Sequence, residues 1–277
     1  MKQLFEQLYL ITRFKIVTRV LLWRKQIYTA LGRNQTQMVN IGAGLFFRPH
    51  WKVLDHVSPF YPFSKRYINH DIDLFTDGPF PFEDASVDFY YSAHTLEHIP
   101  QENCANLLSE VYRTLKPGGA FRLCMPDYDR IRAAADARDE AYFRKQLSRG
   151  MTLEQAVVEQ IATECLDHEN ADAIVHDYAT LDAEEFADRY CGLASRTVQR
   201  KMAGYHINWF NFTKLTGMLE VAGFETAYQS TPQGSAFPEL RGEGGVLTTG
   251  DCFGTKRMLG IDTTHPQISL FVEAVKS

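Results

Sequence analysis

Short apolar segments alternate with helix or loop signals between residues 38 and 126, and this alternation constrains the fold more than any other feature. Parallel strands cannot be joined by a tight turn, so strands separated by crossovers are typical of a parallel sheet. Residues 103–115 carry apolar side chains at helical spacing and are expected to form a helix. Pro117, Gly118 and Gly119 are expected to end it. The strands expected in this stretch are residues 38–41, 51–54, 67–72, 87–91 and 120–125.

The rest of the chain divides into segments of different character. Residues 128 to about 200 are rich in Asp, Glu and Ala with almost no strand signal, which predicts an inserted helical lobe. A helix over 213–221 and strands over 224–229 and 268–275 would complete the sheet at seven strands. The predicted organisation is an N-terminal amphipathic segment (1–36), a cofactor-binding core (37–127), a helical insertion that forms the substrate lobe (128–205) and a return to the core sheet (206–277).

The first 36 residues are basic and have apolar side chains at helical spacing, with Glu6 as their single acid. One or two amphipathic helices are expected. Packing on the domain as a lid over its cleft is the preferred interpretation. The alternative is a helix lying on a membrane surface, as basic helices with Trp and Leu can.

The composition limits which binding partners and which cellular compartment are expected. The formal net charge is −5, so charge-driven binding to nucleic acid is not expected and a small-molecule substrate fits better. The five cysteines are widely spaced and form no C-x-x-C pair, which argues against a disulfide framework and a cysteine zinc site. No apolar run approaches the roughly 20 residues of a membrane span. A cytoplasmic protein is therefore expected.

Glycines and acids follow the strands in a pattern typical of nucleotide binding. Gly42 and Gly44 come directly after the first strand, and Asp55 comes at the end of the second. Glycines let the backbone approach a ligand closely, and a carboxylate in that place can accept hydrogen bonds from ribose hydroxyls. A Gly-x-Gly alone is equally consistent with an ordinary tight turn. Asp73 after the third strand extends the pattern.

Two further motifs make the pattern specific. Leu96-Glu97-His98 follows the fourth strand, and Leu115-Lys116-Pro117-Gly118-Gly119 precedes the fifth. With these motifs the chain resembles class I S-adenosylmethionine-dependent methyltransferases. The resemblance is to the type 11 subgroup in particular, whose members are similar to ubiquinone and small-molecule methyltransferases. The resemblance covers residues 38–126 well and the tail from His206 loosely. It implies a Rossmann-like α/β fold, a seven-stranded mostly parallel sheet with helices on both faces, and S-adenosylmethionine as the cofactor, released as S-adenosylhomocysteine.

The resemblance also implies cofactor-binding residues. The glycine turn would line the methionine part, Asp55 would hold the ribose, Asp73 and Leu74 would meet the adenine, and Ser92 to His94 would border the transferable methyl group. The full set implied is Asn40, Gly42, Ala43, Gly44, Asp55, Asp73, Leu74, Ser92 and His94. The sequence departs from the family where it has Asn40 in place of an acid and Phe46 in place of a third glycine. The short gap between Gly44 and Asp55 also trims the first crossover helix.

Methyl transfer needs a base only if the acceptor is a hydroxyl or similar group. His94 is the first candidate, followed by His98 and Asp127, with Glu97 and His206 also considered. Each has a structural alternative: Glu97 and His98 could cap backbone amides, Asp127 could cap the next helix, and His206 could be packing.

Four polar side chains at regular spacing suggest a possible metal site. Glu164, His168, Asp172 and His176 recur every four residues, so one helix would present all four on one face. Such a face could bind a divalent metal, but a solvated polar face fits its acidic surroundings better, and no metal is expected.

The sequence thus predicts methyl transfer to a small-molecule acceptor such as a sugar, a lipid precursor or a secondary metabolite. One alternative is an enzyme that uses the same cofactor for cyclisation or aminocarboxypropyl transfer. Another is a non-catalytic module that binds the cofactor or a partner. A nicotinamide dehydrogenase is disfavoured because the third glycine is missing.

Overall fold

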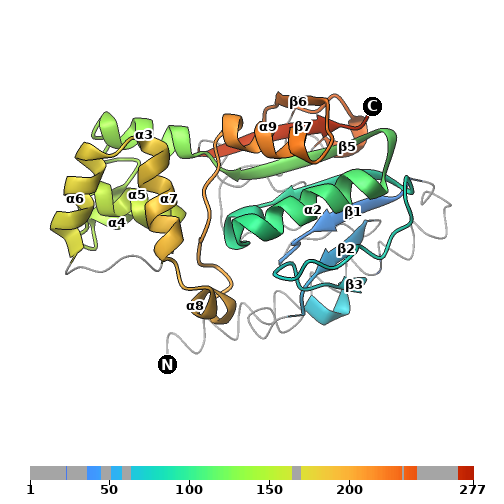
Figure 1. Cartoon of the computed structure of the whole chain (residues 1–277), viewed down its shortest axis with the longest axis horizontal. Coiled ribbons are helices and arrows are strands. Elements are labelled where there is room, and N and C mark those ends of the chain that lie inside the picture. The colour runs from blue at the N-terminus through green and yellow to red at the C-terminus, as the bar shows by residue number, and fades with distance from the viewer. Residues whose placement is uncertain are drawn as a thin grey trace.

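Seven strands form a single sheet in the order β3-β2-β1-β4-β5-β7-β6 (Figure 1). The computed structural model describes residues 23, 36–44, 51–57, 64–163, 170–232, 234–241 and 268–277. Strands β1 to β5 pair in parallel, and β7 runs antiparallel to both of its neighbours. This is the predicted Rossmann-like α/β fold. The strands are β1 (Met38–Ile41), β2 (Lys52–Asp55), β3 (His70–Asp71), β4 (Val87–Ala93), β5 (Leu115–Pro126), β6 (Thr226–Gln229) and β7 (Ser269–Val275).

Helices α2 (Gln101–Thr114) and α9 (Phe212–Val221) lie side by side over one face of the sheet (Figure 1). Their buried leucines and valines recur at helical spacing and form the largest apolar core with the strands. Adjacent side chains of β4 point to opposite faces, so Tyr90 enters this core and Tyr91 packs on Trp51 across the other face. The short helix η5 (Pro238–Leu240) also packs on that second face.

The amphipathic helices expected over residues 1–36 lie outside the described residues, apart from positions 23 and 36. In the part of the chain that the structure describes, no helix is long and apolar enough to cross a bilayer.

Among the described residues, five helices that follow β5 form a lobe beside the sheet, and a sixth, α8 (Arg196–Lys201), lies apart from them before α9 (Figure 1). The lobe packs around an apolar core of its own. Reciprocal capping boxes start two of its helices, one between Thr152 and Gln155 and one between Asp182 and Glu185. The lobe helices are α3 (Tyr128–Asp136), α4 (Arg144–Leu147), α5 (Leu153–Ile161), α6 (Ala171–Thr180) and α7 (Ala183–Leu193).

The bounds of several elements differ from those expected, most clearly at the third strand and around Pro117. The third strand, expected over 67–72, is reduced to the two residues of β3, which pair with Leu54 and Asp55 of β2. Just before it, the Val53 amide donates to the side-chain oxygen of Asn69, and the short helix η1 (Ser64–Arg66) lies further upstream. Helix α2 ends at Thr114, three positions before Pro117, and β5 starts at once by pairing Leu115 with Val87. The Pro-Gly-Gly segment therefore belongs to the irregular beginning of a strand.

Candidate active site

The strand order reverses between β1 and β4, and open α/β sheets bind ligands beyond the carboxyl ends of strands at such a point. Ile41 of β1 pairs with Ser92 of β4, whose hydroxyl donates to the carbonyl of Ile41 at 3.1 Å. The glycine turn follows Ile41 directly, with Gly42 at a φ of 66° and Gly44 at 52°. Asn40 is buried at the end of β1. The structure thus brings these predicted cofactor residues to one edge of the sheet.

Gly42 is required by packing as well as by its backbone conformation. A Cβ atom added there would lie 2.2 Å from Cγ2 of Thr95. The Thr95 hydroxyl lies 3.2 Å from the carbonyl oxygen of Gly42 and 3.3 Å from that of Ile41. Thr95 therefore holds the glycine turn against the loop after β4, a role that the sequence pattern did not reveal.

Asp55 lies beside this turn, at the end of β2. Its carboxylate accepts a hydrogen bond from the Gly44 amide at 2.9 Å and one from the His56 amide at 2.7 Å. Burial raises the pKa of Asp55 more than these two donors lower it. Because carboxylate oxygens have further lone pairs, Asp55 can still accept hydrogen bonds from a ribose.

Asp73 lies two residues beyond β3, and its carboxylate pairs with Arg200 of helix α8 through two hydrogen bonds, one of them 3.1 Å long. Burial would raise the pKa of Asp73, but Arg200 and the amide of Phe75 outweigh it and lower that pKa. Leu74 packs against the main core. The carboxylate expected at the adenine is therefore already paired with helix α8.

His94 has a φ of 52°, which is rare outside glycine and marks a constrained residue. Its Nδ1 lies 3.0 Å from Oε1 of Glu97, and its Nε2 lies 3.2 Å from Oγ of Ser269. Burial alone would lower the pKa of His94, but Cys124 and Glu97 outweigh it and hold that pKa well above its ordinary value. A raised pKa favours the protonated imidazole, which would have to release its proton before His94 could act as the predicted base.

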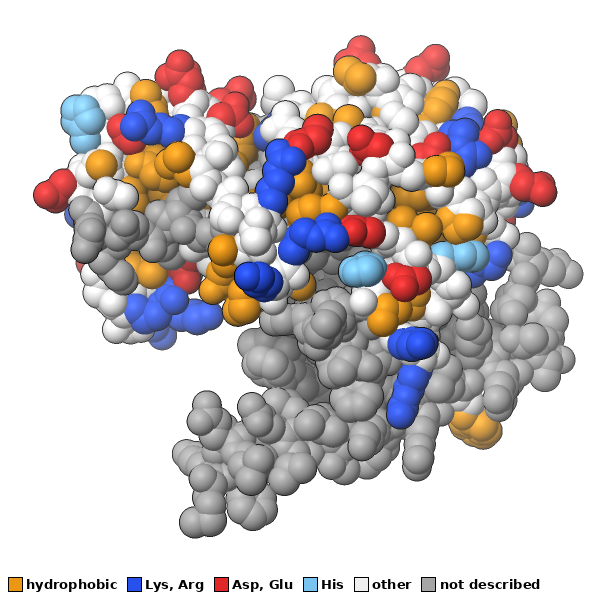
Figure 2. Space-filling view, turned by 60° about the horizontal axis from the view of Figure 1, so that its bottom comes forward, with side chains coloured by type: hydrophobic (Ala, Val, Ile, Leu, Met, Phe, Trp, Pro, Cys, Tyr) orange, Lys and Arg blue, Asp and Glu red, His pale blue; other side chains and the backbone are white. Residues whose placement is uncertain are grey.

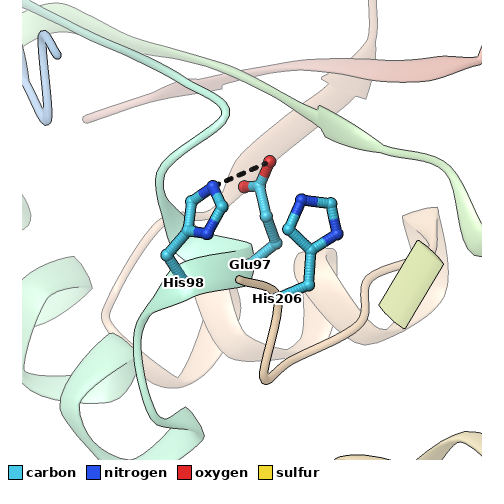
Figure 3. Close-up of side chains that lie close together, drawn as sticks. All are labelled: Glu97, His98 and His206. Atoms are coloured by element: carbon cyan, nitrogen blue, oxygen red, sulfur yellow. Dashed lines mark ion pairs between the residues drawn. The ribbon is translucent and has the colours of Figure 1, made fainter. Parts of the chain in front are cut away.

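Glu97, His98 and His206 point toward one another (Figure 3). Glu97 and His98 belong to the short helix η2 (Leu96–His98), and His206 lies in the segment that leads from the lobe back to α9. Nε2 of His98 lies 3.9 Å from Oε1 of Glu97. Burial would raise the pKa of Glu97, but the hydrogen bond from His94 and the charges of the neighbouring histidines lower it to about 2.

The contacts of Glu97 and His206 bear on interpretations that the sequence left open. The carboxylate of Glu97 pairs with imidazoles, and no side chain caps η2. His206, which sequence reasoning favoured as packing, lies instead with the candidate catalytic residues. Burial lowers the pKa of His206 to about 4, so its imidazole is neutral at neutral pH.

The other predicted residues lie apart from this cluster. Asp127, at the end of β5, pairs with Nε of Arg130 at 3.1 Å, and burial raises its pKa. Helix α6 begins at Ala171, so of the four residues expected on one helix it carries only Asp172 and His176, both exposed. Glu164 and His168 lie outside the described residues.

Comparison with known proteins finds a match for part of the core. The family model described as a methyltransferase domain matches residues 63–123. No curated protein sequence matches the chain significantly.

Three solved structures of S-adenosylmethionine-dependent methyltransferases are similar over most of their length. The Thermotoga maritima protein has 14% identity, full coverage of both chains and a TM-score of 0.40. The Mesorhizobium loti protein has 14% identity, coverage of 87% of this chain and 90% of the other, and a TM-score of 0.41. The Archaeoglobus fulgidus protein has 12% identity, coverage of 93% and 94%, and a TM-score of 0.41.

At these scores the three structures add nothing to the assignment, which depends on the family match and on the site. Two glycines at positive φ, a buried Asn40 and the Asp55 carboxylate meet at the topological switch point, an arrangement that fits a nucleotide cofactor. The core therefore contains a stretch, residues 63–123, that matches a methyltransferase domain, and the geometry of its site fits S-adenosylmethionine as the cofactor.

Proposed function

We propose that this methyltransferase acts on a small-molecule acceptor held between the carboxyl ends of the strands and the helical lobe. The observation that carries the proposal is the position of the lobe. It starts immediately after β5 and returns through His206, so it borders the edge where the glycine turn, Asp55 and His94 meet. Insertions at the carboxyl ends of strands commonly cover such sites.

Each residue at this edge has a role in the proposal. The turn from Asn40 to Gly44, including Ala43, holds the methionine part of the cofactor, and Asp55 accepts hydrogen bonds from the ribose. Asp73 and Leu74 contact the adenine, and Ser92 to His94 border the reacting centre. Bound S-adenosylmethionine supplies a methyl group on a positively charged sulfur, so the protein mainly has to align the acceptor.

His94 stays a candidate base in this proposal, and its raised pKa favours the form that already carries a proton. With its raised pKa, His94 serves to hold Glu97 through a charged hydrogen bond. His98 and Asp127 are the other candidate bases, His98 only while its Nε2 holds no metal ion, and each acts only if the acceptor loses a proton. The raised pKa of Asp127 moves that carboxyl group toward the range where a general base is effective.

The test uses the full chain, methyl-labelled S-adenosylmethionine and a cell extract, followed by mass spectrometry of the labelled product. The expected result is S-adenosylhomocysteine together with a small molecule that is one methylene heavier. Formation of a different cofactor product would favour cyclisation or aminocarboxypropyl transfer. Cofactor binding without any product would favour the non-catalytic alternative.

The variant Asp55→Asn tests the cofactor half of the site. Loss of the carboxylate charge should weaken S-adenosylhomocysteine binding about tenfold or more in isothermal titration calorimetry, because charged hydrogen bonds contribute roughly 1.5–3 kcal/mol. Asp172→Asn, on the exposed face of α6, is the matched control and should leave the dissociation constant within about twofold. Equal affinities for the two variants would remove Asp55 from the cofactor site.

A further inference from the structure

We propose that Glu97, His98 and His206 bind a divalent metal ion of the zinc class. The site lies where η2 of the core meets the end of α5 in the lobe (Figure 3). This inference departs from the expectation of no metal. It does not rest on the proposed function, because metal binding requires neither a cofactor nor an acceptor.

Backbone contacts prepare both histidines as ligands. Nδ1 of His98 lies 2.9 Å from the carbonyl oxygen of Tyr205, and Nδ1 of His206 lies 2.6 Å from that of Gln160. A carbonyl oxygen can only accept, so each Nδ1 must carry a hydrogen, and in a neutral imidazole the lone pair is then on Nε2. Metal-binding histidines in proteins are usually oriented by this kind of hydrogen bond from the other ring nitrogen.

The carboxylate of Glu97 supplies the second and independent observation. Glu97 is only 1% exposed, and its Oε1 accepts the hydrogen bond from His94. Its Oε2 is buried and has no hydrogen-bond partner within the described structure. A buried charged oxygen without a partner is costly, and such atoms call for an explanation such as a bound ion.

The geometry is close to that of a metal site. The three ligand atoms all lie within 4.8 Å of one another. Zinc bonds of about 2.1 Å place tetrahedral ligands about 3.4 Å apart, so side-chain movements on the order of 1 Å would close the site. Two imidazoles and one carboxylate suit zinc and its neighbours, whereas Mg²⁺ and Ca²⁺ prefer oxygen ligands. Three protein ligands also leave a fourth position open.

Because of the position of His206, metal binding should also stabilise the folded chain. The His206 amide donates to Oγ of Thr163 at 3.1 Å, and the Thr163 amide donates to the His206 carbonyl at 3.2 Å. The segment after the lobe is thereby fixed to the end of α5. A metal bound also to Glu97 and His98 would tie this junction to the core and stabilise the folded chain.

The test uses the untagged full chain after treatment with a chelator. Titration with Zn²⁺ alone should show one ion bound per chain and a rise in Tm. Co²⁺ should give the visible absorption bands of a four- or five-coordinate site. Glu97→Gln and His206→Gln should each weaken Zn²⁺ binding at least tenfold and remove the Co²⁺ bands, whereas the control His176→Gln on α6 should change neither.

His98→Gln is the second variant if Glu97→Gln fails to fold, with folding judged by circular dichroism. Absence of stoichiometric Zn²⁺ binding, or binding that Glu97→Gln, His98→Gln and His206→Gln leave intact, would overturn the proposal. Titration of the metal-free chain with S-adenosylhomocysteine tests the cofactor site separately, so the two proposals can fail independently.

Discussion

Glu110 connects α2 to the loop before β4. Its Oε2 accepts from the Phe80 amide at 2.6 Å and from Nη2 of Arg113 at 2.6 Å, and its Oε1 accepts from Nε of Arg113 at 2.9 Å. The hydrogen bond from Arg113 lowers the pKa of Glu110 more than burial raises it. A carboxyl group with a lowered pKa in the folded state adds stability above its unfolded pKa and loses it as the pH falls.

In the variant Glu110→Gln, the free energy of unfolding should therefore depend less on pH in the acid range. The free energy of unfolding of the native chain should fall from about pH 5 toward pH 3, and the variant should lose about 1 kcal/mol less over that range. Urea unfolding at several pH values measures both curves. Glu140→Gln, an exposed substitution after α3, should follow the native curve. If the free energies of unfolding of Glu110→Gln and of the native chain fell equally with pH, the stabilising role given to the Glu110 carboxylate would be contradicted.

At the scale of elements, helix α8 contacts the core through Arg200. The Arg200 guanidinium pairs with Asp73 and lies 4.8 Å from the centre of the Phe75 ring. The same helix carries Arg196, which pairs with Glu102 of α2 at 2.5 Å. Two ion pairs thus join one short helix to two different parts of the core, and only the first involves a residue assigned to the cofactor.

Arg200→Gln should strengthen cofactor binding. The substitution frees the Asp73 carboxylate for the adenine amino group, and because partly exposed ion pairs contribute about 0–1 kcal/mol, the gain should be about two- to fivefold. Isothermal titration calorimetry with S-adenosylhomocysteine measures it. Arg196→Gln is the control and should leave the affinity unchanged. Weaker binding in Arg200→Gln would mean that Arg200 contacts the cofactor itself.

At the scale of the whole molecule, the sheet and the lobe have separate apolar cores. Trp209 packs in the lobe core and its neighbour Phe210 in the sheet core, so adjacent residues of one segment connect the two. Described acidic and basic side chains are interspersed over the face seen in Figure 2. The cofactor residues come from the sheet, whereas the proposed acceptor site needs both parts.

Phe186→Ala should lower the stability of the lobe without weakening cofactor binding at the sheet. Phe186 is fully buried in the lobe core, and truncation of such a side chain costs about 3–5 kcal/mol. Urea unfolding should show this loss, while the dissociation constant for S-adenosylhomocysteine should stay within about threefold. Val221→Ala, at a position that is 88% exposed, should change neither quantity by much. Loss of cofactor binding in a folded Phe186→Ala chain would show that the lobe shapes the cofactor site.

Much of the fold could be predicted from local patterns. The apolar run of β4, the helical spacing in α2 and the glycine after β1 each depend on a few neighbouring residues, and these patterns are strong in this chain. The bounds of β3 could not be predicted, because its length depends on the partner that β2 offers. Thr95 could not be recognised either, since its contact with Gly42 exists only after β1 and β4 pair.

The sequence by itself determined the fold class and the motifs whose resemblance to a known family implies the cofactor, because these depend on residue types at fixed short spacings. Only the tertiary structure decided the electrostatics of the site. Arg200 reaches Asp73 from 127 positions away, and Tyr205 orients His98 from 107 positions away. Burial and neighbours of this kind set the pKa values of His94, Glu97 and His206, and both arise when distant segments pack together.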